Sequence, residues 1–310
     1  MRALFLGLDK DAAKTFAAHK IDIVFEPAKF FGRCLQQPAI AWFPDLQHRR
    51  MPQMFGWLAW WRREIGFRQQ LRHDRTILLS SKDALNDCEK YYPQSKGRAR
   101  VLRFPAVIEA KDFATDPKSV LSQYQIPDRF IYLPNQFWRH KNHALVIEAL
   151  GILRRRGSDV RVVATGNPSD PRDPTIYPRL MSRLNELGAT SMFQVLGIMP
   201  RSHVIALLRT CSALINPSVC EGWSTGVEEA KMLGVPMLLS DIAVHREQAG
   251  VVATYFDVGD PATLADFLVA ASQSIVDCPR ALADDAANAA QTFAVAFAEI
   301  AIEAYRGRRR

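Results

Sequence analysis

The 310-residue chain has few cysteines and lacks a long apolar segment. Its five cysteines, at positions 34, 88, 211, 220 and 278, are scattered, odd in number and include no C-x2-C pair. This pattern excludes a cysteine-rich metal site and fits a protein of the reducing cytoplasm. No apolar run approaches the roughly 18 residues that suggest a membrane-spanning helix. The opening residues, MRALFLGLDKD, become charged too soon for a secretory signal peptide.

Sequence motifs for nucleic-acid binding are also missing. The chain has no RNP, zinc-finger or helix-turn-helix signature, so we expect no nucleic-acid partner. Basic residues are nevertheless in excess: 40 Lys and Arg against 32 Asp and Glu give a formal net charge of +8 and a pI near 9.4. This charge favours anionic partners, such as phosphate-bearing substrates or acidic membrane surfaces.

What the sequence does contain is a repeating order of strand, turn and helix. The length exceeds what one core usually supports, so two domains are expected. In the second half the apolar strands are continuous, which predicts a parallel sheet covered on both faces. Residues 105–129 are polar and irregular. We therefore predict an α/β fold with a first domain over 1–110, a linker over 111–129, a second domain over 130–290, and a C-terminal helix with a basic tail over 291–310.

The segment SVCEGWSTGVEEAKMLGVPMLLSD, residues 218–241, is the most informative part of the chain. A short apolar strand at 213–215 leads into it, and Thr225 with Glu228 fits a capping box at the start of a helix. Glu221 then lies on the loop before the helix, whereas Glu229 lies one turn inside it. The backbone N–H groups between the two carboxylates predict a phosphate site.

A second strand, loop and helix surround Lys141. A strand at 130–133 precedes the loop, and a helix at 144–156 follows it. The loop is expected at the carboxyl edge of the sheet, where Lys141 reaches a pyrophosphate as a flexible point charge. A solvated surface lysine is the alternative.

Glu221 and Glu229, separated by seven residues and flanked by Pro217, Gly222, Gly234 and Pro236, resemble the Glu-x7-Glu motif of retaining glycosyltransferases of family 4. The segment FWRHKNHALVIEAL resembles that family's lysine loop, with Asn135 where the family has an arginine. The resemblance implies the GT-B architecture, with two Rossmann-like domains facing a cleft. The family's glycine-rich loop is missing near the start of this chain, so the N-terminal domain is expected to be shortened.

The resemblance also implies roles in binding the donor. Lys141 and backbone N–H groups of 222–225 would hold the diphosphate, Glu229 the ribose, and Glu221 the hexose, while the loop 197–200 would lie against the base. The predicted donor-binding residues are Asn135, Lys141, Gly197, Met199, Gly222, Ser224, Thr225 and Glu229.

Two further catalytic candidates, beside Glu221, come from the first domain. A strand at 39–43 leads into Pro44-Asp45, where many members of the family carry His-Asp. His48, three residues later, is a substitute for that histidine on the acceptor side, and Asp45 shares the assignment. The alternative is a structural histidine or a surface residue.

Residues 54–75 combine an aromatic stripe with interleaved arginines. Phe55, Trp57, Leu58, Trp61, Ile65 and Leu71 recur at helical spacing. We expect a core helix with a solvated basic face. The alternative, a helix at a membrane interface, gains weight if the acceptor is linked to lipid.

The function implied by the resemblance is retaining transfer of a hexose from a nucleotide-diphosphate sugar to a glycan or lipid-linked acceptor. The matching subset suggests mannose and polysaccharide biosynthesis. We recognise no Asp-x-Asp motif of the sort that metal-dependent glycosyltransferases use, so neither a metal nor another cofactor is expected. The predicted location is cytoplasmic, with peripheral contact at the inner face of the membrane. A nucleotide-sugar epimerase, or a non-catalytic nucleotide-sugar-binding or glycan-assembly protein, remains an alternative.

Overall fold

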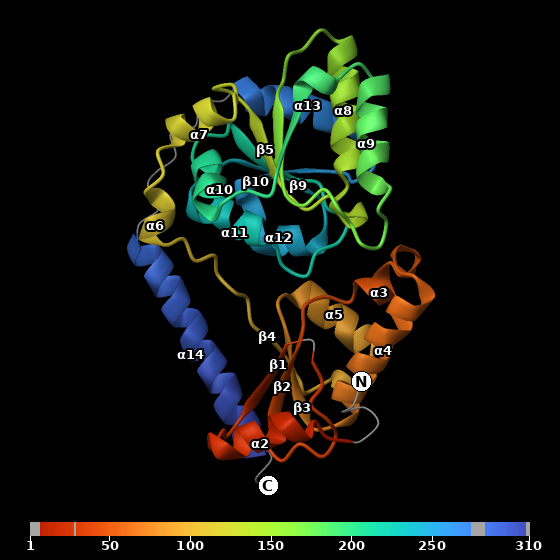
Figure 1. Cartoon of the computed structure of the whole chain (residues 1–310), viewed down its shortest axis with the longest axis vertical. Coiled ribbons are helices and arrows are strands. Elements are labelled where there is room, and N and C mark those ends of the chain that lie inside the picture. The colour runs from red at the N-terminus through yellow and green to blue at the C-terminus, as the bar shows by residue number, and fades with distance from the viewer. Residues whose placement is uncertain (1–6, 28, 274–282, 308–310) are drawn as a thin grey trace. The chain divides into compact units, whose positions relative to one another are not determined.

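The chain forms two compact units in a computed structural model (Figure 1). The structure describes residues 7–27, 29–273 and 283–307, with side chains in the last stretch from residue 288. One unit comprises Met1–Phe104 and Ala289–Arg310, and the other comprises Pro105–Asn288. Among the described residues, no helix has both the length and the apolar character needed to cross a bilayer.

The second unit is built on one parallel sheet of six strands in the order β10-β9-β8-β5-β6-β7. This confirms the parallel sheet that the apolar runs predict, because a strand covered on both faces needs apolar residues on both sides. The strands are β5 (Ile131–Pro134), β6 (Val162–Thr165), β7 (Phe193–Gly197), β8 (Ala213–Asn216), β9 (Met237–Ser240) and β10 (Ala253–Phe256).

Helices cover both faces of this sheet (Figure 1). On one side pack α8 (His143–Arg155), α9 (Ile176–Glu186) and α13 (Pro261–Gln273), and on the other α7 (Pro117–Gln123), α10 (Arg201–Leu208) and α11 (Thr225–Met232). The predicted linker, 111–129, carries α7 and most of α6 (Ala110–Phe113), and both helices pack against α10. A short helix that the sequence pattern does not predict, α12 (Ala243–Ala249), follows β9 and packs against α11.

The first unit contains a smaller parallel sheet in the order β1-β2-β3-β4. Its strands are β1 (Val24–Pro27), β2 (Ala39–Phe43), β3 (Arg75–Leu79) and β4 (Ala99–Val101), and its helices are α2 (Lys10–Ala18), α3 (Gln47–Arg50), α4 (Trp57–Arg72) and α5 (Lys82–Tyr91). The last helix, α14 (Ala283–Gly307), packs Phe293, Phe297 and Ile300 in a cluster with Ile40 and Leu78 of this sheet. Short 3₁₀ turns occur in both units. They lie at Pro52–Met54, Pro93–Ser95, Arg139–Lys141, Thr190–Met192 and Gly250–Val252.

The orientation of α4 differs from the expected core helix. Its buried residues are Glu64, Phe67, Gln70 and Leu71, and of these Phe67 and Leu71 pack in the hydrophobic core of the first unit. Trp57 and Leu58, expected in the core, are 72% and 73% exposed, and Trp61 and Ile65 are also exposed. The expectation holds for Leu71 and is wrong for these four residues, because α4 carries apolar residues on more than one side and only the side at 64, 67 and 71 meets the core.

Candidate functional site

The two loops singled out in the sequence follow β5 and β8, which are neighbours at the centre of the six-stranded sheet. The strand order reverses between them, because connections from β5 run towards β7 and those from β8 run towards β10. Open α/β sheets bind ligands outside the carboxyl ends of the strands at such a switch point. Here a hydrogen bond of 3.1 Å from Asn135 Nδ2 to Asn216 Oδ1 joins the ends of the two strands.

Lys141 and Glu221 form an ion pair at this switch point. Lys141 ends the 3₁₀ turn, and the next residue, Asn142, adopts a left-handed backbone with φ of 53° that turns the chain into α8. The two side chains are 13% and 8% exposed. The amide of Val219 donates to the carbonyl of His140 at 2.9 Å, which ties the two loops together. The topology therefore brings together two residues that are 80 positions apart.

The electrostatics keep Glu221 ionised. Burial alone raises the pKa of its carboxyl group, but the charge of Lys141 and hydrogen bonds from Lys141 and Ser218 outweigh that effect and lower the pKa of Glu221 below its ordinary value. Another anion that binds the ammonium group of Lys141 can replace the carboxylate of Glu221 as its partner.

Behind Glu221 lies a buried hydrogen-bonded chain that the sequence argument did not assign. Ser218 Oγ lies 2.7 Å from Asn216 Oδ1, and Ser240 Oγ donates to the carbonyl of Ser218. His245 Nδ1 lies 3.0 Å from the Ser240 carbonyl, so this nitrogen carries the proton. Its buried Nε2 has no hydrogen-bond partner among the described residues. Burial lowers the pKa of His245, although the charge of Glu221 opposes this, and the ring is therefore neutral near pH 7.

The start of α11 is capped differently from the prediction. Ser224 is the capping residue, since its Oγ accepts from the amide of Val227 at 3.4 Å, and Thr225 is the first helical residue. Glu228 accepts from Gln248 Nε2 and Lys231 Nζ instead of from a backbone amide. The predicted capping box was wrong by one position, because Ser and Thr stand side by side and both suit a cap.

Gln248 of α12 holds Ser224 in place. The amide of Ser224 donates to Gln248 Oε1, and Gln248 Nε2 donates to the Ser224 carbonyl, both at 3.0 Å. The local sequence of α12, which includes HREQ at His245–Gln248, does not by itself indicate a role for His245 or Gln248.

Glu229 is buried on α11 and pairs with Arg201. Burial raises the pKa of Glu229, and the hydrogen bond and charge of Arg201 offset part of this rise. Arg201 also donates to the Val107 carbonyl at 3.1 Å and lies 3.8 Å from Asp112. Nothing in the local sequence points to this arginine beyond its position directly after the loop 197–200.

The remaining predicted donor-binding residues lie at the end of β7, on the loops that follow β7 and β8, and at the start of α11. Gly222 is buried and Thr225 is exposed. Gly197 ends β7 with φ of 72°, a backbone conformation that favours glycine, and its carbonyl accepts from the amide of Gly166 at 2.8 Å. Met199 is partly buried against the core on the α10 side of the sheet.

The two acceptor-side candidates lie in the first unit. His48 is fully buried, and its Nε2 lies 3.2 Å from both Glu64 Oε2 and Tyr92 Oη. Burial lowers the pKa of His48 to about 4. Asp45 pairs with Arg63 and accepts from the amide of Gln47 at 3.0 Å. These contacts favour the structural-histidine alternative for His48 and give Asp45 a local structural role.

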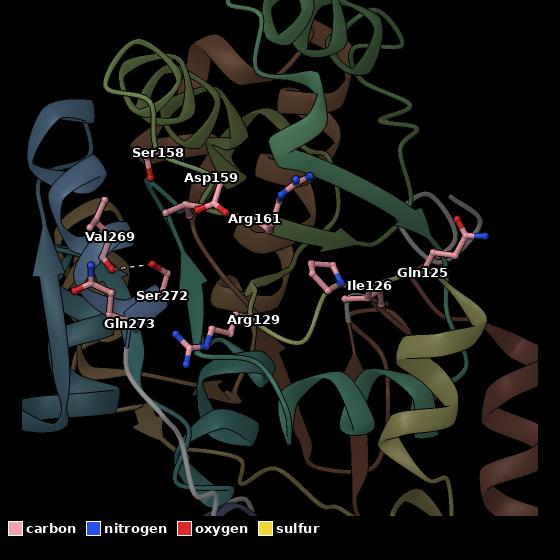
Figure 2. Close-up of a pocket in the computed structure, with 11 residues that line it drawn as sticks. Gln125, Ile126, Arg129, Ser158, Asp159, Arg161, Val269, Ser272 and Gln273 are labelled. Atoms are coloured by element: carbon pink, nitrogen blue, oxygen red, sulfur yellow. Dashed lines mark hydrogen bonds between the residues drawn. The ribbon is translucent and has the colours of Figure 1, made fainter.

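A separate cavity of about 650 Å³ lies at the opposite edge of the six-stranded sheet (Figure 2). Residues that precede β5 and β6, with the end of α13, line it, and Arg129, Asp159 and Arg161 are among them. None of the predicted donor-binding residues belongs to its lining. In the described part of the chain, no three His, Cys, Asp or Glu side chains gather as a metal site requires.

Comparison with known proteins gives a family match that covers most of the second unit. Residues 122–291 match the sequence model of the family "Glycosyl transferases group 1". "Putative glycosyltransferase EpsF" of Bacillus subtilis (strain 168) is 25% identical over 206 residues, which cover 63% of this chain and 52% of EpsF. The chain thus spans about half the length of this curated relative.

Solved structures show the same fold at low identity. A glycosyltransferase from Rickettsia africae ESF-5 has a TM-score of 0.69 at 14% identity, covering 95% of this chain and 80% of that one. Anabaena Alr3699/HepE in complex with UDP and glucose has a TM-score of 0.69 at 15% identity, covering 93% and 80%. With its two parallel sheets, the protein has the GT-B fold class. Since the family match covers more than half of its residues, the chain belongs to the group 1 glycosyl transferases.

Proposed function

We propose that this protein is a glycosyltransferase whose donor is a nucleotide-diphosphate sugar. The observation that carries the proposal is the buried pair of Lys141 and Glu221 at the switch point of the sheet, just before the N-terminus of α11. A cation and the free N–H groups of a helix start both favour a diphosphate. In support, solved structures of Anabaena Alr3699/HepE are complexes with UDP and glucose and with UDP-glucose.

In the proposed donor complex, Lys141 exchanges its partner. Its ammonium group pairs with the diphosphate, because charge-assisted hydrogen bonds to phosphate are strong. Glu221 is then free to accept hydrogen bonds from hydroxyls of the hexose. Glu229, already held by Arg201, accepts from the ribose hydroxyls, and the loop 197–200 lies against the base.

The proposed reaction is transfer of a hexose with retention of configuration, and mannose is the proposed sugar. The leaving diphosphate is stabilised by Lys141 and the N-terminus of α11, so the proposal needs no metal ion or other cofactor. Loss of one such preorganised donor typically raises the barrier by about 3 kcal/mol. Transfer should accordingly continue in the presence of a chelator, and NMR of the product would give its anomeric configuration.

The proposed acceptor is a glycan or a lipid-linked glycan in polysaccharide biosynthesis, and the proposed location is the cytoplasm. The similarity to "Putative glycosyltransferase EpsF" supports the reaction class.

The first test is thermal unfolding with GDP, UDP and ADP. At a hundredfold excess over Kd, the matching nucleotide should stabilise the fold by about 2.7 kcal/mol. Lys141→Met should lose this gain, whereas Lys118→Met, which removes an exposed lysine on α7, should keep it. Absence of a shift with all three nucleotides would contradict the proposed donor site.

A second assay separates an enzyme from a protein that only binds the donor. Wild type should transfer or hydrolyse GDP-mannose or another nucleotide sugar, and Glu221→Gln should abolish turnover while the thermal shift with the nucleotide remains. Binding with no turnover in the wild type, against every donor and acceptor tried, would favour the non-catalytic alternative.

A further inference from the structure

Helix α4 presents an apolar surface to the solvent. Trp57, Leu58, Trp61 and Ile65 are 72%, 73%, 44% and 42% exposed. Spacings of four residues from 57 to 61 and from 61 to 65 align them in one stripe along the helix, which borders the side that buries Glu64, Phe67 and Leu71. We call this stripe, with the exposed Arg62, Arg68 and Arg72, the outer face of α4 (α4 is orange in Figure 1).

The buried side of the helix is firmly attached, so the outer face cannot turn inwards without breaking buried contacts. Trp60 Nε1 donates to the carbonyl of His48 at 2.6 Å, and Tyr92 Oη donates to Glu64 Oε2 at 2.6 Å. Arg49 and Arg68 also pair with Glu64. Trp61 packs edge-on against Trp60, with ring centroids 4.9 Å apart. The exposure of the tryptophans therefore follows from the fixed orientation of α4.

The charge on this surface has one sign. Arg62, Arg68 and Arg72 are exposed, and the only carboxylate of α4, Glu64, is fully buried. Hydrogen bonds from Arg49, Tyr92 and Arg68 outweigh the effect of burial and lower the pKa of Glu64 to about 2. Its negative charge is therefore paired with these groups and is not exposed on the helix surface. The outer face thus combines large apolar side chains with positive charge and has no exposed carboxylate.

We propose that the outer face of α4 binds the surface of a membrane that contains anionic lipid. Tryptophan prefers the boundary between headgroups and acyl chains, where its ring is buried and its N–H stays hydrated. Arginines beside it are attracted to anionic headgroups. Charge complementarity selects this occupant over an uncharged protein surface. The surface lies outside the donor site, and it would bring the proposed enzyme to a lipid-linked acceptor.

Vesicle co-sedimentation of the full chain tests the apolar part of this surface. Vesicles of phosphatidylcholine with about one third phosphatidylglycerol should bind the protein, and vesicles of phosphatidylcholine alone should bind it much less. Trp57→Ser with Trp61→Ser should weaken binding about tenfold. The matched control, Val251→Ser with Val252→Ser, removes two exposed apolar side chains of the second unit and should bind as the wild type does.

The charged part is tested by Arg62→Gln with Arg72→Gln. Binding to the anionic vesicles should fall about tenfold, because each arginine near the surface contributes separately. Arg154→Gln with Arg155→Gln removes the same net charge from exposed positions on α8 and should have little effect. Raising the salt concentration should weaken wild-type binding, since exposed charges are screened.

Each variant should keep the thermal unfolding and the nucleotide response of the wild type, which shows that it is folded. Equal binding to neutral and anionic vesicles, or unchanged binding of both α4 variants, would overturn the proposal. Light scattering addresses a second copy as the occupant: a wild-type dimer that Trp57→Ser with Trp61→Ser converts to a monomer would make the outer face a self-association surface instead.

Discussion

At the scale of single residues, Lys141 and Glu221 depend on each other. Burial is the largest effect on the carboxyl group of Glu221, and it acts against ionisation. The ion pair is retained because the charge and the hydrogen bond of Lys141 compensate for that cost. Removing one partner of a buried pair leaves an uncompensated charge, whereas replacing both removes the cost with the interaction.

We therefore expect Lys141→Met to lower the free energy of unfolding by about 3 kcal/mol at pH 7. Without the lysine, burial should raise the pKa of Glu221 above its unfolded value, so this carboxyl group disfavours folding as the pH rises through the raised pKa. Urea unfolding at pH 7 and pH 5 should show a smaller difference from wild type at pH 5. In the wild type the pKa is lowered, so the contribution of Glu221 is present at neutral pH and lost as the pH falls through that lowered pKa.

The double variant Lys141→Met with Glu221→Gln provides the control for this explanation. It should be more stable than Lys141→Met alone, because no buried charge is left unpaired. If the two changes simply add, the single variant is destabilised by lost packing and the electrostatic account fails.

The sequence pattern pointed to Lys141 and Glu221, which the structure pairs, but not to Arg201 and His245. The first two follow strands and are embedded in recognisable segments, so strand order alone brings them to one edge of the sheet. Arg201 meets Glu229 across 28 positions, and His245 reaches the site through Ser240 and Ser218. These contacts depend on how α10 and α12 pack, which no local pattern contains.

At the scale of elements, buried strands were predictable and helix orientation was not. β2 begins and ends where the pattern predicts, because an apolar run is a local signal. α4 has apolar residues around most of its circumference, so its sequence alone cannot decide which side meets the sheet. The start of α11 shows the same limit at one residue, since Ser224 and Thr225 are equivalent as local cap signals.

The cap of α11 can be tested directly with its neighbour as the control. Ser224→Ala should lower the free energy of unfolding by about 1 kcal/mol, because the Oγ accepts from the amide of Val227 and from Asn216 Nδ2, 3.0 Å away. Thr225→Ala should cost much less, since Thr225 is exposed and lies inside the first turn. Chemical unfolding of both variants measures the difference. A larger loss for Thr225→Ala would restore the predicted capping box.

At the scale of the whole molecule, the two units have separate hydrophobic cores. The first unit packs Phe43, Phe67 and Leu79 beneath α4 and α5, whereas the second has a cluster on each face of its larger sheet. Each core is built from residues of its own unit. Two parallel sheets with independent cores behave as separate folding units unless they are strongly coupled, so a single unfolding free energy need not describe the chain.

This organisation predicts two thermal transitions with different responses to nucleotide. All residues proposed to hold the donor belong to the second unit, and a ligand stabilises only the folded state to which it binds. Calorimetry with the matching nucleotide should therefore raise the transition of the second unit and leave the other in place. Ser224→Ala should lower the ligand-sensitive transition, whereas Glu64→Gln, which disrupts the buried pairs beneath α4, should lower the insensitive one. A single transition that both variants and the nucleotide shift together would mean that the two units unfold as one cooperative body.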